Sequence, residues 1–580
     1  MAQPITGHVP EPTMNMNRPN NNGHDSYEMT DAELAGIEPT INDGPEARLS
    51  RFLYVGKEYP DYQPGYWFVH NYFIVKNVPS IEELAATPGK ELVPILLITK
   101  AFESNLVPHP ETLVFALAVC GRQTISEKLR HEAFASVQKI CTTTEQFILF
   151  VRFTSKLKRE NELCYLTFGW GNGMKKAVNN WYLSKEPLAL AKCVTKYRSR
   201  YGWKHKDIIK LCHTVGDTPE KAVILRYIVK GLSEAKQFAS ELAENTTVEI
   251  VMKYIENIEL FKHCEEETSA AALLQELGLS LEHVPGHLLK CKKIWIELIS
   301  MMDMVMLLNN LQRINNLRLL KPNVAAEKVI ELLRNEELIA RDKVHPVEIL
   351  IALINYQNCG KPLSFEKRRI REAAKKPHQL PFEPNQDVIS ALNTAFYASF
   401  SHLQRTDLRY LVTISSNKKT VEGRAWQCGN MRGVEVGCFI AMTLVRQESD
   451  VTVATFKDNE IHVVDVGNEE TYEQVVRKLR EISTANIKLS KPLLWAMKMK
   501  KEYDVFINIV DQVYEKHDRS QESLSLYRNM MQLPDAKLIN CAVCSSATYR
   551  KTQYDKNVLI INGFDATVPK LIQAFVQSLF

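Results

Sequence analysis

The sequence has no apolar run that could cross a membrane, because no stretch of about 18 or more apolar residues occurs in it. No hydrophobic segment near the first residue resembles a signal peptide. Its 12 cysteines are scattered through apolar stretches and lack the spacing of secreted, disulfide-bonded domains. We therefore expect a protein of a reducing compartment with no membrane partner: a cytoplasmic protein, with an additional nuclear pool as the alternative.

Recognisable catalytic motifs are also missing. The sequence has no phosphate-binding Gly-x-x-x-x-Gly-Lys-Ser/Thr loop, no Gly-x-Gly-x-x-Gly and no His-Glu-x-x-His, and its Ser, His and Asp residues suggest no triad. A single Cys541-Ala-Val-Cys544 pair falls in an apolar, strand-like run, which favours core thiols over a metal or redox site. A nuclease would need clustered carboxylates for metal catalysis, and none stands out. We expect neither a cofactor nor an enzymatic activity.

The chain also has little net charge, since 72 Lys and Arg residues face 68 Asp and Glu residues and leave a net charge of +4. A general nucleic-acid polycation is thereby excluded. The positive excess is local, however, because residues 152–210 contain 14 Lys or Arg and only 4 Asp or Glu. Any polyanion should therefore bind at this segment.

The composition divides the chain into three parts. Residues 1–47 are rich in Asn, Pro, Gly and acidic residues, which is typical of a disordered tail. Residues 48–400 show apolar residues at helical spacing, with breaks at Pro and Gly every 10 to 18 residues. Many medium helices with short breaks favour a helix-pair solenoid of the HEAT class, and an irregular helical bundle is the alternative.

Residues 405–580 have a different pattern, in which short β-branched runs alternate with amphipathic helices. The runs expected as strands are 409–415, 450–456, 460–466, 504–510, 537–544 and 557–563, and the helices are 434–446, 471–483, 492–501 and 568–579. Continuous apolar strands that alternate with helices predict a mostly parallel, doubly wound α/β sheet. The whole chain is therefore predicted to combine an α part with an α/β part.

Two basic stripes stand out in the segment 187–213. Lys192, Lys196 and Arg200 recur every four residues, and Lys206, Lys210 and His213 follow at i, i+4 and i+7. On helices each set would line one face, where like charges repel by a few tenths of a kcal/mol per pair. An external polyanion would relieve this repulsion, and RNA phosphate is the obvious candidate.

With these stripes, the chain resembles the TROVE-domain family of large SS-A/Ro ribonucleoprotein autoantigens. The most specific match is VTKYRSRYGWKHKDIIKLCH (194–213). Further matches are RLSRFLYVG (48–56), ETLVFALAVC (111–120), WGNGMKKAVNNWY (170–182), VHPVEILIAL (344–353) and INGFDA (561–566). The resemblance extends from about residue 48 to the last residue.

The resemblance implies a HEAT-repeat-like helical ring that is closed by a C-terminal, Rossmann-like von Willebrand factor type A domain. It implies that Y-type small noncoding RNA binds the outer surface of the ring, and that single-stranded 3′ ends of misfolded small RNAs enter the central hole. The function would be noncoding RNA quality control by a protein that is not an enzyme. Other RNA-binding proteins are further candidate partners, and a monomer is expected.

Three RNA-contact positions of the family carry over to Lys196, Arg200 and His213, which lie on the two stripes. Further candidate contacts are Lys192, Arg198, Lys206, Lys210, Lys175 and Lys176. The alternative for all of them is an ordinary solvated basic face. Four aromatic residues interleave the charges, and their helical spacing favours core packing over base stacking: Trp170, Trp181, Tyr197 and Trp203.

The metal site that is usual in the family's type A domain is degenerate in this sequence. Such a site needs hard oxygen ligands in an Asp-x-Ser-x-Ser loop, with a Thr and an Asp from later loops. Ser415 stands in the first Asp position, and Asn417 and Lys419 stand in the two Ser positions. The later loop aligns with residues 485–488 (Ala-Asn-Ile-Lys), so that only Asp511 keeps a carboxylate. We predict no metal, with an alignment slip that hides a real site as the alternative.

Two further alternatives remain open. The basic segment 361–384 could contact RNA, direct nuclear import or be a solvated loop. The whole chain could also be a HEAT-type protein–protein scaffold that has lost RNA binding, although the retained Lys196, Arg200 and His213 argue against this.

Overall fold

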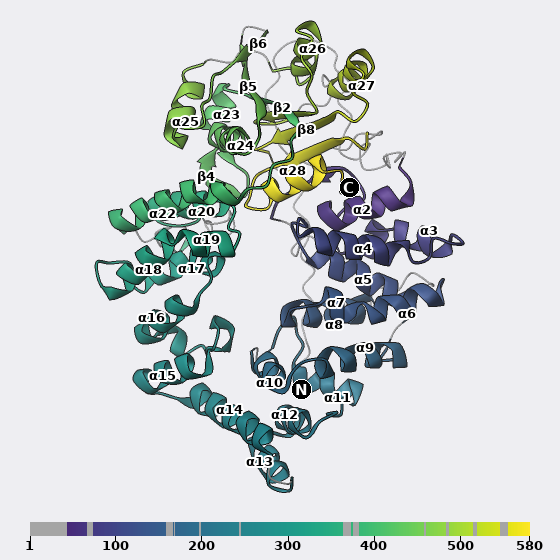
Figure 1. Cartoon of the computed structure of the whole chain (residues 1–580), viewed down its shortest axis with the longest axis vertical. Coiled ribbons are helices and arrows are strands. Elements are labelled where there is room, and N and C mark those ends of the chain that lie inside the picture. The colour runs from purple at the N-terminus through teal and green to yellow at the C-terminus, as the bar shows by residue number, and fades with distance from the viewer. Residues whose placement is uncertain are drawn as a thin grey trace.

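The computed structural model describes residues 43–65, 73–157, 166–167, 169–196, 199–242, 245–362, 370, 373–374, 382–457, 460–482, 487–513, 519–545 and 555–580. Within them the chain forms a curved array of helices followed by a C-terminal α/β domain, which begins at Arg409 (Figure 1). The array leaves this domain along one arm, turns, and returns to it along a second arm. The predicted helical ring closed by an α/β domain is therefore confirmed. No helix in these described ranges is long and apolar enough to cross a membrane.

The helices of the array follow one another in chain order around the ring. The first arm contains α2 (Pro45–Val55), α3 (Ser80–Ala86), α4 (Val93–Ser104), α5 (Glu111–Arg122), α6 (Glu127–Ala135), α7 (Val137–Ile140), α8 (Thr144–Leu157), α9 (Asn172–Leu183), α10 (Pro187–Thr195) and α11 (His205–Cys212). The array turns through α12 (Pro219–Lys230), α13 (Leu232–Ser240) and α14 (Thr246–His263). The second arm contains α15 (Glu267–Leu277), α16 (Lys292–Met301), α17 (Met304–Asn316), α18 (Val324–Arg334), α19 (Glu336–Arg341), α20 (Pro346–Gln357) and α22 (Gln386–Ala398). Short 3-10 turns are η1 (Val75–Asn77), η2 (Leu281–His283), η3 (Leu288–Lys290) and η4 (Ser399–His402).

Helix boundaries in the array follow from local sequence signals. The α12 helix begins at Pro219, and the Thr218 side chain accepts a hydrogen bond from the backbone N–H of Lys221. It stops at Gly231, whose φ of 101° suits glycine. Each helix then packs mainly on the next ones along the chain, as α10, α12, α14, α15 and α16 do in succession. This is the arrangement of a solenoid and not of an irregular bundle.

The N-terminal end of the array departs from the prediction in two places. The α2 helix begins at Pro45, inside the segment expected as a disordered tail, because proline is well suited to the first position of a helix. Residues 1–42 of that segment lie outside the described residues. In addition, Asp61 and Tyr62 form a short strand, β1, which joins the sheet of the C-terminal domain.

The C-terminal domain contains a sheet of seven strands within the described residues, in the order β1-β9-β8-β7-β2-β5-β6. Besides β1, its strands are β2 (Arg409–Ile414), β5 (Asp450–Lys457), β6 (Glu460–Val463), β7 (Val505–Val510), β8 (Lys537–Ala542) and β9 (Val558–Asn562). All neighbours are parallel except β5 and β6, which are antiparallel. A separate two-stranded ribbon joins β3 (Arg424–Ala425) to β4 (Cys428–Arg432). The predicted α/β class and all six predicted strands are confirmed.

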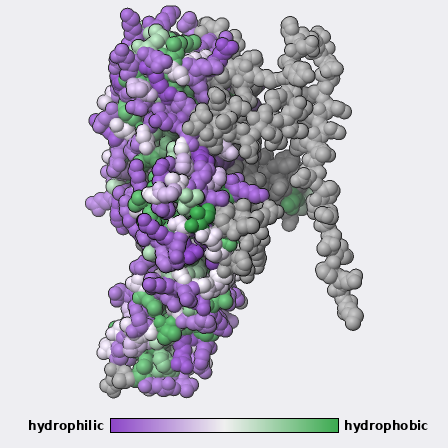
Figure 2. Space-filling model, turned by 90° about the vertical axis from the view of Figure 1, so that its right-hand side faces the viewer, coloured by the Kyte–Doolittle hydropathy of each residue, from purple (hydrophilic) through white to green (hydrophobic). Residues whose placement is uncertain are grey.

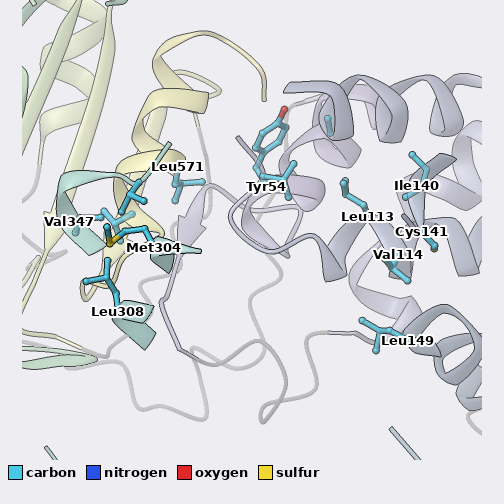
Figure 3. Close-up of a cluster of buried hydrophobic side chains, with 14 of the residues drawn as sticks. Tyr54, Leu113, Val114, Ile140, Cys141, Leu149, Met304, Leu308, Val347 and Leu571 are labelled. Carbon is cyan, nitrogen blue, oxygen red and sulfur yellow. The ribbon is translucent and has the colours of Figure 1, made fainter. Parts of the chain in front are cut away.

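Helices cover both faces of this sheet. They are α23 (Lys418–Glu422), α24 (Gly433–Gln447), α25 (Tyr472–Arg480), α26 (Lys491–Lys498), α27 (Ser520–Met531) and α28 (Val568–Val576). The α24 and α28 side shares one continuous apolar core with the helical array, whereas α26 and α27 cover a separate core on the opposite side. Figure 3 shows this continuity, since Leu571 of α28 lies beside Val347 of α20 and Met304 of α17.

Polar contacts join both ends of the helical array to the C-terminal domain. At the start of the array, β1 pairs with β9, and the Tyr62 hydroxyl lies 2.5 Å from the Thr567 hydroxyl and 3.0 Å from His109 Nε2. At the other end, the Asn430 side-chain amide of β4 donates to Asn355 Oδ1 of α20 at 2.9 Å. The ring is therefore closed through the C-terminal domain.

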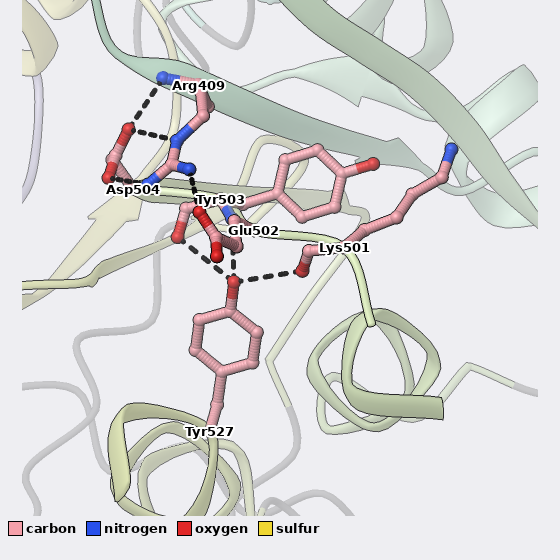
Figure 4. Close-up of polar contacts among 6 residues, drawn as sticks. All are labelled: Arg409, Lys501, Glu502, Tyr503, Asp504 and Tyr527. Atoms are coloured by element: carbon pink, nitrogen blue, oxygen red, sulfur yellow. Dashed lines mark hydrogen bonds and ion pairs between the residues drawn. The ribbon is translucent and has the colours of Figure 1, made fainter. Parts of the chain in front are cut away.

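The register of the central strands is fixed at their amino-terminal ends by a polar cluster (Figure 4). The Arg409 guanidinium donates to both carboxylate oxygens of Asp504, at 2.9 and 2.8 Å, across the β2–β7 pair. These hydrogen bonds hold the pKa of Asp504 below its ordinary value, against the opposing effect of partial burial. The Tyr527 hydroxyl of α27 accepts from the Tyr503 N–H and donates to the Lys501 carbonyl. The cluster therefore fixes β2 and β7 relative to each other, and this holds the loops that follow their carboxyl ends in a defined position.

Candidate nucleic-acid interface

Two members of the second basic stripe, Lys206 and Lys210, lie on the exposed face of α11 (His205–Cys212). Ile208, Ile209 and Cys212 of this helix are buried, and Lys206 and Lys210 are exposed on its other side. The prediction that these two lysines share a helical face is therefore correct. The helix packs against α9, toward the right-hand edge of the lower first arm in Figure 1.

His213, the third member of the stripe, directly follows the last residue of α11, which corrects the prediction that all three side chains share one helical face. Its φ of 54° places it in the left-handed region, and the next N–H, of Thr214, donates back to the Ile209 carbonyl at 3.2 Å. The Thr214 hydroxyl also donates to Asn179 Oδ1 of α9 at 2.6 Å. His213 is thus an exposed side chain on a firmly held backbone.

Lys175 and Lys176 lie near the beginning of α9 and not in its last turn. Lys176 is exposed and Lys175 is half-buried beside Cys212 of α11. None of these α9 and α11 lysines forms a salt bridge in the described part of the chain.

The first stripe does not form one helical face, which corrects the prediction. The α10 helix ends at Thr195, Lys196 follows it directly, and Arg200 lies in a tight turn with Trp203. Two backbone hydrogen bonds of 3.0 and 2.9 Å close this turn between Arg200 and Trp203. Its central residues, Tyr201 and Gly202, both have positive φ, which is typical of a two-residue hairpin turn. Arg198 and Tyr197 lie outside the described residues.

Lys192 and Lys196 lie close to residues 278–283, at the beginning of the second arm. The Lys192 side chain lies against Gly278 at the end of α15, and its carbonyl is 3.1 Å from His283 Nε2 in η2. Lys196 Nζ lies 3.7 Å from Glu282 Oε2 in the same turn. Both lysines therefore lie close to the beginning of the second arm, and Lys196 pairs with it through its charged group.

Arg200 is paired with a carboxylate from α8. Its Nε donates to Glu145 Oε1 at 3.1 Å, its Nη2 donates to the same oxygen, and so does the Tyr201 hydroxyl. Sequence reasoning missed both carboxylates, because Glu145 and Glu282 lie far from the basic segment along the chain. No local pattern would have revealed them.

Buried aromatic side chains pack between the helices that carry these basic residues. The Trp181 ring of α9 stacks on Phe147 of α8 with 3.7 Å between ring centroids, and its Nε1 donates to the Cys141 carbonyl at 2.6 Å. The Tyr182 hydroxyl contacts His205 Nδ1 at 2.7 Å, and burial lowers the pKa of His205 to about 4. Core packing is therefore the correct reading for Trp181.

The other two described aromatics are only half-buried. Trp170 and Trp203 meet edge to face with 5.8 Å between their centroids, beside the Arg200 turn. The surface of the first arm around this region is mainly hydrophilic, with small apolar patches toward its lower end (Figure 2). Polar and charged groups thus dominate what an incoming ligand would meet.

The degenerate metal-site loop is occupied by hydrogen bonds within the protein. Ser415 is buried at the end of β2, and its hydroxyl accepts from the Thr420 hydroxyl at 3.1 Å. Asn417 caps α23 with its Oδ1 and donates through Nδ2 to Asp511 Oδ1 at 3.0 Å. The Asn417 amide thus donates where a cation would have to bind, so these residues do not fit a divalent metal.

The remaining residues of this region agree with that conclusion. Lys419 is exposed on α23, and the aligned positions 485 and 486 lie outside the described residues. Cys541 is buried in β8, where burial raises the pKa of its thiol to about 12. Burial also raises the pKa of Cys544, to about 11, so neither thiol is a ready thiolate ligand.

We expect calorimetric titration of Mg²⁺ or Mn²⁺ into the full-length protein to give no stoichiometric binding in the micromolar range. The physical reason is that one carboxylate, already hydrogen-bonded to Asn417, cannot replace the hydration of a divalent cation. Stoichiometric micromolar binding that disappears in the Asp511→Asn variant would contradict this expectation.

Comparisons with known proteins agree with both parts of the chain. A family model described as the TROVE domain matches residues 94–407, and one described as the Ro60 vWA domain matches residues 409–576. The chain is 23% identical to the RNA-binding protein RO60 of Caenorhabditis elegans over 92% of this chain and 88% of that protein. It is 22% identical to the protein of the same name from Deinococcus radiodurans, over 97% of this chain and 98% of that protein.

A solved structure gives the same result for the fold. The crystal structure of the Deinococcus radiodurans RO (RSR) protein matches with a TM-score of 0.77 at 20% sequence identity. The match covers 93% of this chain and 100% of that chain. Helical ring and closing domain therefore occur together in both molecules.

Proposed function

This chain belongs to the TROVE family, and from that premise we propose that it is an RNA-binding ribonucleoprotein component. Its ligand is a structured small noncoding RNA of the Y type, which binds the outer surface of the first arm. We name this surface the α9–α11 interface and define it by Lys175, Lys176, Lys196, Arg200, Lys206, Lys210 and His213.

The observation that carries this proposal is the set of unpaired lysines on two contacting helices. Lys176 of α9 and Lys206 and Lys210 of α11 are exposed, and no carboxylate of the described residues neutralises them. Lysines that neutralise RNA phosphates would release the cations condensed around the RNA, and this release favours binding. Because A-form duplexes are recognised mainly through backbone and shape, such a surface suits a folded RNA stem.

The remaining parts of the proposal follow from the family. The central hole of the ring accepts single-stranded 3′ ends of misfolded small RNAs, and the protein acts in noncoding RNA quality control. The proposal assigns no enzymatic step to the chain, and places it in the cytoplasm. His213 hydrogen-bonds a phosphate, a ribose hydroxyl or a base edge at the end of the α11 stripe.

A fluorescence-anisotropy titration tests this function. A labelled RNA that folds into a bulged stem should bind at least about tenfold more tightly than an unstructured RNA of equal length, because only a rigid stem holds its phosphates against several cations at once. The affinity should fall steeply between about 50 and 200 mM salt. Equal affinity for both RNAs, or no binding, would contradict the proposal and favour a protein–protein scaffold.

A further inference from the structure

The two cations that follow α10 differ from the lysines of α9 and α11 in one respect: each is paired with a carboxylate from another part of the ring. Lys196 is paired with Glu282, and Arg200 with Glu145. Carboxylates repel phosphate, so their presence in a surface proposed to bind phosphate indicates a specific role.

Glu145 is held in a defined position. It lies in the first turn of α8, a helix whose other side is buried through Phe147, Ile148 and Leu149. Its Oε1 atom receives hydrogen bonds from the guanidinium of Arg200 and from the hydroxyl of Tyr201. The carboxylate therefore binds two consecutive residues of the tight turn, and fixes the turn and the Arg200 side chain together.

The pair is also open to solvent. The Arg200 and Glu145 side chains are 43% and 39% exposed, so that the pair adds little to the stability of the fold. A guanidinium carries five N–H donors in a planar fork, and it can bind a carboxylate with one edge and a phosphate with another. The geometry is thus that of an arginine prepared for an anion and not of one withdrawn from solvent.

We propose that Glu145 is a positioning residue of the α9–α11 interface, which orients Arg200 for one phosphate of a folded RNA and repels RNA that lacks that fold. This inference rests on the proposed function. A folded stem brings a phosphate to the oriented edge of Arg200, so that little side-chain freedom is lost on binding. A flexible RNA makes no such fixed contact, and meets the negative charge of Glu145 beside the cations.

Glu145→Gln separates these two effects because it removes the charge and keeps the shape. For the folded RNA, the neutral amide should hold the Arg200 guanidinium less firmly than the carboxylate does, which should weaken binding by about three- to tenfold. For an unstructured RNA of equal length, the loss of a negative charge should strengthen binding by about two- to fivefold. The affinity for the folded RNA divided by that for the unstructured RNA should therefore fall, because the first decreases and the second increases.

The matched control is Glu103→Gln. Glu103 also forms an exposed pair with a lysine of the same arm, Lys139, at 2.7 Å, and has no contact with the interface. The Glu103→Gln variant removes the same charge away from the interface, so the ratio of the two affinities should stay unchanged. Glu282 is less suitable for this test because its neighbour His283 contacts the carbonyl of Lys192.

The outcomes are distinct. Opposite shifts for the two RNAs in Glu145→Gln support the inference, since damage to the fold would weaken both and a simple charge effect would strengthen both. Shifts in the same direction, or shifts equal to those of Glu103→Gln, overturn it while the proposed function stands. If the wild-type protein itself does not prefer the folded RNA, the proposed function fails and the inference fails with it.

Discussion

Replacement of Lys196 and Arg200 together by alanine should weaken binding of a Y-type RNA by about 30-fold or more. In the proposed complex each side chain donates a charged hydrogen bond to phosphate, and about 1 kcal/mol lost for each corresponds to this factor. The structure adds a second cause. Without Arg200, the carboxylate of Glu145 loses its cation and repels the phosphate that the arginine would have bound.

A charge-matched variant separates local contacts from the overall field. Lys90 and Lys139 are exposed lysines of the first arm that pair with Glu46 and Glu103, and neither belongs to the α9–α11 interface. Lys90→Ala with Lys139→Ala removes the same total charge, so its affinity should stay within about threefold of wild type. Equal losses in both double variants, measured by gel shift, would mean that RNA does not bind at the proposed surface.

The second large effect concerns stability. Trp181→Ala should lower the free energy of unfolding of the helical array by about 3 to 5 kcal/mol, because it removes a buried ring that stacks on Phe147 and leaves a cavity. It also leaves the Cys141 carbonyl without the indole donor. Denaturant unfolding followed by far-ultraviolet circular dichroism measures this loss.

The Trp181→Ala variant also distinguishes a core-packing role of the tryptophan from a base-stacking role. Trp170→Ala is the comparison, because this ring is half-buried and its loss should cost roughly half as much. If Trp181→Ala kept wild-type stability and lost RNA binding, the ring would be a stacking platform for bases and the assignment to the core would be wrong.

The sheet was largely predictable because its strands are continuous β-branched and apolar runs. The expected strand 504–510 corresponds to β7 (Val505–Val510), in which every residue is buried. The antiparallel direction of β6 also follows from the sequence, since two residues separate it from β5 and a parallel crossover needs about a dozen. Strand β1 was not predictable, because its two residues are too short to show any period.

The interface was predictable only in part. Lys206 and Lys210 could be placed because α11 has a strong helical period with three buried apolar residues. Arg200 was misplaced on a helix, although the Tyr201-Gly202 pair that follows it is a signal for a turn with positive φ. Glu145 and Glu282 come from distant segments, and only the closure of the array brings them to the basic residues.

In the degenerate metal-site loop, the residue types were evident from the sequence, but their hydrogen bonds were not. Asn417 in a Ser position of the motif already argued against a metal. The structure adds that its amide is hydrogen-bonded to Asp511 and its carbonyl oxygen caps α23. The loop is thus held by hydrogen bonds among its own side chains.

The salt dependence of binding tests the central claim most directly. The affinity of the folded RNA is measured for wild type and for the Lys196→Ala, Arg200→Ala double variant across about 50 to 200 mM salt, and its logarithm is plotted against the logarithm of salt concentration. Loss of two phosphate contacts should make the variant's slope shallower by about 1 to 2 units. Two parallel lines with the same affinity would contradict the assignment of RNA binding to the α9–α11 interface.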